Sequence, residues 1–149
     1  MLLAGNFKMR KQTGFTLIEV IVVLVILGIL ASIVAPNVIG NVDKSRVVKA
    51  KQDIRALESA LQMYRVDNFQ YPTTDQGLQA LVEKPSTGAE AKNWQKGGYI
   101  PKLPKDPWQN EYQYISPGES GDYDLYTLGA DGAPGGSDYN ADITHLDLE

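Results

Sequence analysis

The chain has 149 residues, no cysteine and a formal net charge of −4. Its length is typical of one domain, the absence of cysteine excludes disulfides and thiol chemistry, and the small negative charge argues against binding of nucleic acid. Charge is unevenly distributed, because no Lys or Arg follows Lys105, whereas acidic residues continue to the end of the sequence.

The N-terminal segment has a short basic stretch followed by an apolar run over residues 17–39. An ordinary secretory signal has an apolar core of roughly 7–15 residues, so this run is too long for one. It reaches the roughly 20 residues that cross a bilayer as a helix. The basic residues Lys8, Arg10 and Lys11 predict a cytoplasmic N-terminus, with the rest of the chain on the other side of the membrane.

One acidic residue, Glu19, lies in this apolar run, and no Lys or Arg follows it before Lys44. A carboxylate in lipid is costly, and such residues usually have a partner and a function. The simple alternative is that Glu19 reaches the membrane surface and binds nothing specific. A plain membrane anchor explains the length of the run, but it explains neither Glu19 nor the junction of Gly14 and Phe15.

Residues 16–66 are predicted to form one long helix. Pro36 can kink or locally melt it, because proline has no N–H donor. Beyond Pro36, apolar residues recur at spacings of three and four, as on one face of a helix. This stripe consists of Val47, Ala50, Ile54, Leu57, Leu61 and Tyr64.

The rest of the chain predicts a small head. Thr74 or Asp75 is expected to cap a short helix that extends to residues 81–82. Glycines among polar residues in 86–98 are typical of a loop. Residues 111–115 and 123–128 alternate as strands do, which gives an antiparallel sheet of two or three strands. The predicted fold is therefore α+β, with the long helix packed on a small sheet.

The sequence GFTLIE at residues 14–19, after a basic leader and before an apolar stretch, resembles the class III signal of type IV pilins and pseudopilins. This resemblance implies that an inner-membrane prepilin peptidase removes the leader, residues 1–14, and methylates the new amine of Phe15. It implies that residues 15–39 remain as a transmembrane helix that later forms the core of a helical filament. Residues 40–149 would form a periplasmic head.

The resemblance also implies a partner for Glu19, namely the positively charged amine of Phe15 in a neighbouring subunit. Two charges that are each costly in lipid become tolerable when they are apposed, because their attraction is strong at low dielectric. A subunit out of register would leave a buried charge unpaired. Glu19 is therefore predicted to set the register of assembly.

Three segments of the head resemble one branch of this family, the major pseudopilins of the bacterial type II secretion system. They are YPTTDQGLQAL, GGYIPKLPKDPWQNEYQY and YDLYTLGADG. The resemblance implies a filament subunit, held in a Gram-negative inner membrane by a single span before assembly, that helps move folded proteins across the outer membrane. Its implied partners are other copies of the chain, the prepilin peptidase, minor pseudopilins, an inner-membrane assembly platform and an outer-membrane secretin.

Two other functions remain open on the sequence alone. A type IV pilus subunit would share the N-terminal part, but many such pilins close their C-terminal region with a disulfide. A membrane-anchored periplasmic module with a calcium-dependent ligand site would require neither the junction of Gly14 and Phe15 nor Glu19.

The C-terminal stretch from Gly129 offers carboxylates and free carbonyls without neighbouring positive charge. Calcium binds six to eight oxygen ligands in flexible geometry, so this composition favours a calcium site that would replace a disulfide as a staple. The resemblance to major pseudopilins implies two carboxylate ligands and several backbone carbonyls, with one amide as a further candidate. These ligands are Asp131 and Asp138, carbonyls near Leu128, Ala133 and Gly136, and Asn140.

Two alternatives to this site remain. Residues 138–142 with Glu149 match positions 1, 3, 5 and 12 of an EF-hand loop, but Ile143 stands at position 6, where the turn requires glycine. Alternatively, the acidic tail is an ordinary solvated or disordered segment.

The chain is not predicted to be an enzyme, because the sequence has no recognisable catalytic motif. His145, its only histidine, is expected to be a surface residue. Trp94 and Trp108 are expected to pack in the head. No glycine-rich phosphate loop of the P-loop or Rossmann kind is present.

Overall fold

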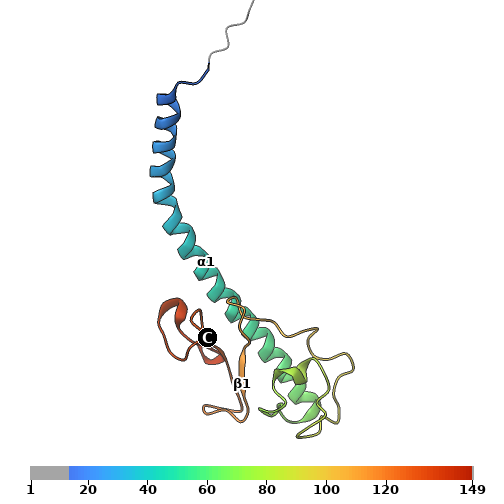
Figure 1. Ribbon diagram of the computed structural model, residues 1–149. Helices are drawn as coiled ribbons and strands as arrows, with labels where there is room; N and C mark the ends of the chain where they lie inside the picture. The colour runs from blue at the N-terminus through green and yellow to red at the C-terminus, as the bar shows by residue number, and fades with distance from the viewer. Residues whose placement is uncertain (1–13, 149) are drawn as a thin grey trace, which may run out of the picture. The chain divides into compact units, whose positions relative to one another are not determined.

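The computed structural model describes residues 14–148, with the backbone alone for residues 35–39. The predicted leader, apart from Gly14, lies outside the described residues, as does Glu149 of the EF-hand alternative. The chain divides into two compact units that meet between Gly40 and Asn41. Helix α1, Leu17–Asn68, contributes to both units (Figure 1).

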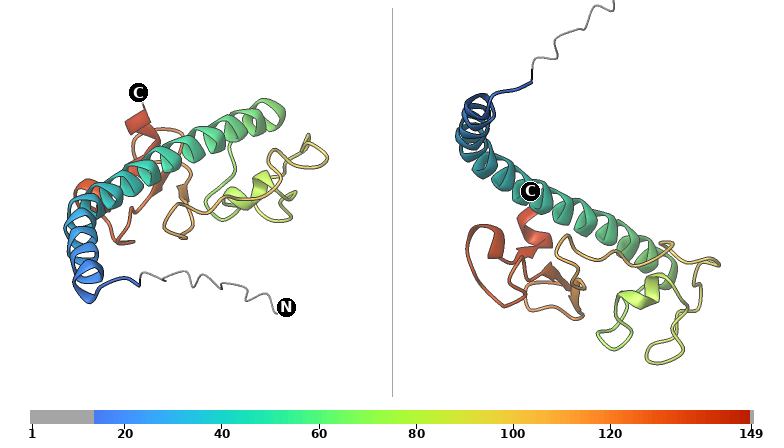
Figure 2. Two further views of the ribbon diagram at one scale, coloured as in Figure 1. Left: turned by 90° about the horizontal axis from the view of Figure 1, so that it is seen from above. Right: turned by 45° about the horizontal axis from the view of Figure 1, so that its top comes forward.

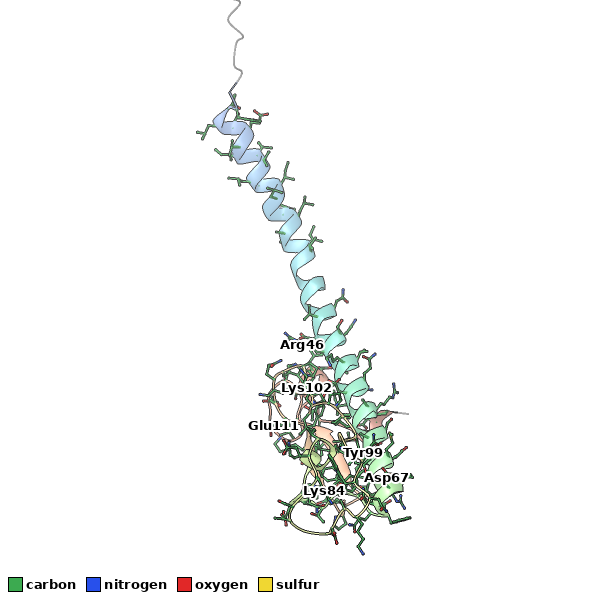
Figure 3. All side chains as sticks on the ribbon, turned by 90° about the vertical axis from the view of Figure 1, so that its right-hand side faces the viewer. Arg46, Asp67, Lys84, Tyr99, Lys102 and Glu111 are labelled. Carbon is green, nitrogen blue, oxygen red and sulfur yellow. The ribbon has the colours of Figure 1, made fainter. Side chains whose placement is uncertain are left out.

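The first unit consists of the N-terminal part of α1. All residues of Leu17–Val34 are exposed, and this segment is long and apolar enough to cross a membrane, with a mean hydropathy of 3.1. Figure 3 shows its side chains projecting from all sides of the helix. The backbone of residues 35–39 remains helical, so Pro36 does not melt α1.

The second unit has its core along the C-terminal part of α1. The predicted stripe is confirmed, because Ile54, Leu61 and Tyr64 are 0% exposed and Leu57 is 1% exposed. Burial of each large apolar side chain stabilises the fold by about 1.5–3 kcal/mol. The rest of this core comes from the segments that pack on α1. They contribute Leu78, Ala80, Leu81, Ala91, Tyr112, Tyr114, Tyr123, Leu125 and Ile143.

A three-stranded antiparallel sheet supplies much of the surface that packs on α1. Its strands are β1 (Gln113–Ile115), β2 (Asp124–Thr127) and β3 (Ile143–Thr144), in the order β1-β2-β3. Tyr114 pairs with Leu125 and Thr127 pairs with Ile143, and all four side chains are buried. β1 is shorter than predicted, since Glu111 forms only an isolated bridge with Lys105.

The acidic C-terminal segment is folded against the rest of the second unit, so the alternative of a disordered tail is wrong. It contains the 3-10 helices η2 (Asp138–Asn140) and η3 (His145–Leu148), and it lies beside the middle of α1 in both views of Figure 2. Lys51 Nζ donates to the carbonyl of Asp147 at 3.4 Å, and Arg55 Nη2 donates to that of Leu148 at 2.6 Å.

His145 is less exposed than expected. Its ring packs on that of Tyr123, with centroids 5.0 Å apart, and its Nδ1 lies 3.3 Å from the backbone nitrogen of Leu125. The expectation of packing roles for the tryptophans is confirmed, because Trp94 and Trp108 are partly buried against the core. Trp94 Nε1 also donates to the carbonyl of Ala80 at 2.8 Å.

The predicted short helix is present, but its predicted cap is wrong. The 3-10 helix η1, Leu78–Leu81, has Gly77 as its N-cap, without a side-chain hydrogen bond. The hydroxyl of Thr74 instead donates to the carbonyl of Ser116 at 3.0 Å and accepts from its N–H at 2.9 Å. Thr74 therefore binds Ser116, which is distant in the sequence, instead of capping η1.

The loop over residues 86–98 is held by two buried amide side chains. Gln76 donates to the carbonyls of Thr87 and Ala89, at 2.7 and 2.8 Å. Asn68, at the end of α1, donates to the hydroxyl of Tyr99 and accepts from the N–H of Asn93, at 3.0 and 3.1 Å. Figure 3 shows Tyr99 beside Asp67, whose carboxylate accepts from the Tyr99 hydroxyl at 3.0 Å.

Candidate functional sites

The first candidate site is the start of α1. Residues 14–16 precede the helix without regular secondary structure, and both Gly14 and Phe15 are exposed. Thr16 Oγ1 accepts from the N–H of Glu19 at 3.3 Å, which caps the helix. The peptide bond predicted to be cleaved therefore lies outside the helix, in backbone that a peptidase can bind.

Glu19 lies in the first turn of α1, where a carboxylate is favoured by the helix dipole. Its side chain is exposed and so available to a second chain. The predicted pairing of Glu19 with Phe15 of a neighbouring subunit is an interaction between chains, so it stays a prediction.

The second candidate site is the loop over residues 128–142, and a buried carboxylate fixes its start. Asp106 is 1% exposed and accepts from the N–H groups of Trp108 and Asn110, at 2.9 and 2.8 Å. Its other oxygen accepts from the hydroxyl of Thr127 at 2.5 Å. Because Thr127 directly precedes Leu128, this network sets where the loop leaves β2.

The two ends of the loop are held together at close range. The N–H of Ala130 donates to the carbonyl of Tyr139 at 3.0 Å. Gly129 is buried with a φ of 68°, and a Cβ there would lie 2.7 Å from the carbonyl oxygen of Ala141. Only glycine allows this approach, since a side chain would separate the two ends.

The predicted calcium ligands occupy both ends of this loop. Asp131 and Asp138 are exposed, and each is a direct neighbour of a residue in the Ala130–Tyr139 hydrogen bond. Asp131 Oδ1 also accepts from the N–H of Ala133 at 3.0 Å. Ala133, Gly136 and Asn140 are exposed, whereas Leu128 is half-buried.

The EF-hand alternative is wrong. Its first three positions lie in the 3-10 helix η2, and Ile143, at its sixth position, is buried in strand β3. Within residues 14–148, no group of three or more acidic or histidine side chains is arranged to hold a metal ion. An ion in this loop would therefore depend on backbone carbonyls as well as on carboxylates.

Sequence reasoning missed the role of Asp142, which it considered only as an EF-hand position. Asp142 Oδ2 accepts from the N–H of Gly135 at 3.0 Å. Oδ1 is buried and has no hydrogen-bond partner among the described residues. An unpaired, buried carboxylate oxygen in a loop that also carries exposed carboxylates and backbone carbonyls suits a hard cation such as calcium, so the residues present fit that ion.

Asp147 lies in the same acidic segment, but its carboxylate accepts two hydrogen bonds, whereas one oxygen of the Asp142 carboxylate has no donor among the described residues. Its Oδ2 accepts from the N–H and from the hydroxyl of Thr144, at 2.9 and 2.8 Å. These two hydrogen bonds lower the pKa of the Asp147 carboxyl. Asp147 is thus a carboxylate satisfied by its own chain.

Comparison with known proteins decides the family. The family model described as "Type II secretion system (T2SS), protein G" matches residues 37–146, and that described as "Prokaryotic N-terminal methylation motif" matches residues 9–35. The chain belongs to the type II secretion system protein G family. This membership favours a secretion-system role over that of a type IV pilus subunit.

Relatives from several bacteria match nearly the whole chain. The type II secretion system core protein G of Vibrio cholerae is 61% identical over 142 residues, covering 95% of this chain and 97% of that protein. The corresponding protein of Pseudomonas aeruginosa is 58% identical over 138 residues, covering 93% and 97%. These relatives are structural secretion-system pseudopilins.

A solved structure supports the same assignment. The crystal structure of the major pseudopilin from the type 2 secretion system of enterohaemorrhagic Escherichia coli has 47% sequence identity and a TM-score of 0.67. The match covers 76% of this chain and 96% of that chain. It confirms the predicted α+β fold of a long N-terminal helix with a small antiparallel sheet.

Proposed function

We propose that this chain is the structural subunit of a type II secretion pseudopilus, which polymerises into a helical filament and helps move folded proteins across the outer membrane. The observation that carries the proposal is the exposure of Leu17–Val34 on all sides, a segment that begins within the GFTLIE sequence. Soluble proteins rarely leave such a large apolar surface in water. Lipid covers it before assembly, and other copies of the chain cover it in the filament.

Before assembly, the chain is held in the inner membrane by this single helix, with its head in the periplasm. The basic residues ahead of the apolar run support that orientation. The prepilin peptidase, minor pseudopilins, an assembly platform and a secretin are the partners that such a subunit requires. The chain acts as a building block, and its relatives are structural proteins as well.

Mass spectrometry of the chain purified from cells that contain prepilin peptidase tests the processing step. We expect a mature protein that begins at Phe15 and carries one methyl group on its amine. The same chain from cells without the peptidase is the control and should retain its leader. An intact leader in both preparations, or a cut elsewhere, would contradict the proposed processing.

Replacement of Glu19 tests the assembly step. Glu19→Gln removes the charge but keeps the shape, so the amine of a neighbouring Phe15 loses its ionic partner at low dielectric. We expect filament formation to be strongly reduced while the head stays folded. Asp43→Asn is the matched control, because Asp43 pairs with Arg46 of its own helix at 3.0 Å. We expect this variant to form filaments normally. Normal filaments of Glu19→Gln would rule out the register role.

The loop over residues 128–142 is the proposed calcium site. Asp131 and Asp138 would supply carboxylate oxygens, and Leu128, Ala133 and Gly136 would supply carbonyls. The loop is mostly exposed, so apolar burial contributes little against its conformational entropy. A bound ion that joins its two ends would stabilise the folded state, by about 2.7 kcal/mol at a free concentration 100 times the Kd.

A thermal melt of the chain in detergent micelles, with calcium and after chelation by EGTA, tests this site. We expect chelation to lower the Tm and added calcium to restore it. Magnesium is the control and should restore less, since it prefers a smaller octahedral site and keeps its water ligands. A Tm that is the same with calcium and with EGTA would exclude the site.

A further inference from the structure

Asp142 holds the two peptide units that flank the Cα atom of Gly135. Its backbone N–H donates to the carbonyl of Gly135 at 3.2 Å, and its Oδ2 accepts from the N–H of Gly135 at 3.0 Å. The peptide units adjoining these two carry the carbonyls of Ala133 and Gly136, which are proposed calcium ligands. Because each peptide unit is planar, fixing these two units limits where the flanking units, and therefore their carbonyls, can lie.

The other oxygen of Asp142 has no such partner. Oδ1 is buried, and no donor within residues 14–148 reaches it. A buried, charged oxygen without a donor costs free energy unless a positive charge lies nearby. The loop itself offers none, because the sequence after Lys105 has no Lys or Arg. Among the described residues, Asp142 also forms no salt bridge with a basic residue from elsewhere in the chain.

We infer that Asp142 is a positioning residue of the calcium site, an outer-sphere carboxylate that orients the peptide units on both sides of Gly135 and whose unpaired oxygen is compensated by the bound cation. This inference rests on the calcium site proposed above. Asp142 is not counted among the direct ligands, since the described residues contain no group of three acidic side chains placed around one ion. It acts through the loop backbone and through its charge.

The substitution Asp142→Asn separates these effects in the full chain in detergent micelles. The amide can still accept from the N–H of Gly135, but it carries no charge. Calcium affinity, measured by titration calorimetry, should fall about 10- to 100-fold, as is usual when an outer-sphere partner of a metal site is removed. The Tm in EGTA should stay unchanged or rise, because a buried, uncompensated charge has been removed. The rise of Tm on adding calcium should therefore shrink.

Asp147→Asn is the matched control. It removes one negative charge from the same acidic segment, but Asp147 is already satisfied by Thr144. We expect this variant to lower the Tm equally in calcium and in EGTA, with calcium affinity unchanged. If Asp142 had only a structural role, Asp142→Asn would also lower the Tm equally in calcium and in EGTA and would leave the calcium affinity unchanged. That result would overturn the inference.

Amide hydrogen exchange in the unmodified chain keeps the test decisive if Asp142→Asn fails to fold. Calcium should slow exchange at the N–H of Gly135 much more than at the N–H of Thr144. Equal effects at both amides would overturn the inference, as would wild-type calcium affinity in Asp142→Asn. If the unmodified chain does not bind calcium at all, the calcium site itself fails, and the role of Asp142 fails with it.

Discussion

The two parts of α1 have the same backbone and opposite environments. Residues 17–34 are apolar apart from Glu19 and Ser32 and are exposed around the whole helix, whereas residues 47–64 bury one stripe against the rest of their own chain. A helix can thus be stabilised within its chain or left to be stabilised by lipid and other chains. In this protein the second part of α1 carries the fold, and the first part offers the apolar surface for the proposed assembly.

The difference also separates two kinds of experiment. Residues 14–40 contain no Trp or Tyr, so intrinsic fluorescence reports the second unit alone. The free energy of unfolding measured in this way should respond to substitutions from residue 41 onward and should not respond to those in residues 17–34. The following predictions test that separation.

The largest effect is expected from the substitution Asp106→Ala. It leaves the N–H groups of Trp108 and Asn110 and the hydroxyl of Thr127 without their acceptor inside the protein. A fully buried donor left unsatisfied costs about 1–3 kcal/mol, and the two donors other than the Thr127 hydroxyl are only partly buried and cost less. We therefore expect the free energy of unfolding to fall by about 3–5 kcal/mol. Urea denaturation followed by fluorescence measures this. Asp43→Ala, which removes a surface ion pair, should change it by less than about 1 kcal/mol.

A matched pair of leucines tests the comparison directly. Leu61 is 0% exposed and Leu24 is 61% exposed. Leu61→Ala should lower the free energy of unfolding by about 3 kcal/mol, because it leaves a cavity in the core. Leu24→Ala should leave that value unchanged. A loss of similar size for both variants would show that the two parts of α1 unfold as one unit.

Alkaline pH should destabilise only the tyrosine-rich second unit. Burial raises the pKa of Tyr114 to about 12, and its hydroxyl donates to the carbonyl of Pro72 at 2.8 Å. Below pH 10 this contribution is fully present. As the pH rises from about 10 to 12, the unfolded chain loses the proton first, so the contribution of Tyr114 to stability falls by about 1.4 kcal/mol per pH unit. Tyr112 and Tyr123, whose pKa values burial also raises, add to this loss.

Denaturation midpoints of the protein and of Tyr114→Phe between pH 9 and 12 check this prediction. The phenylalanine variant starts from a lower stability, because it lacks the hydrogen bond, but its profile should be flatter above pH 10. Parallel profiles would contradict the assignment of this pH dependence to Tyr114.

The smallest change in the free energy of unfolding is expected at the end of α1, and it is an increase, whereas Asp106→Ala and Leu61→Ala lower this value. Phe69 adopts a left-handed conformation, with a φ of 63°, and is 83% exposed. Phe69→Gly should raise the free energy of unfolding by about 1 kcal/mol, since glycine adopts this conformation without steric cost. Val66→Gly, one turn earlier in the regular helix, should lower it by a similar amount. Equal signs for the two variants would contradict this account.

The sequence predicted what depends on periodicity and on local motifs. The long helix and its stripe follow from spacings of three and four, and the two longer strands follow from alternation. The two residues of β3 are too few to alternate, so the sequence located no third strand. The cap of η1 was missed because the hydroxyl of Thr74 binds Ser116, far away in the sequence.

The buried polar residues were not predictable either, because their hydrogen bonds join segments that are distant in the sequence. Asn68, Gln76 and Asp106 are acceptors or donors for segments that only the folded chain brings together. Nothing in their immediate sequence distinguishes them from surface residues. Asp142 is similar, because its role depends on Gly135 and on the burial of one oxygen. The proposed ligand residues, by contrast, were indicated by composition and by the family resemblance.

The contacts between the last described residues and α1 determine where a tag or a dye can be attached to this protein. Lys51 and Arg55 donate hydrogen bonds to the carbonyls of Asp147 and Leu148. A tag or fluorescent protein fused after Leu148 would therefore disturb two contacts that stabilise the fold. Because the chain lacks cysteine, Lys84→Cys would introduce a unique thiol at an exposed position remote in sequence from both candidate sites (Figure 3). A dye attached at that thiol would let individual subunits be followed without disturbing either end of the molecule.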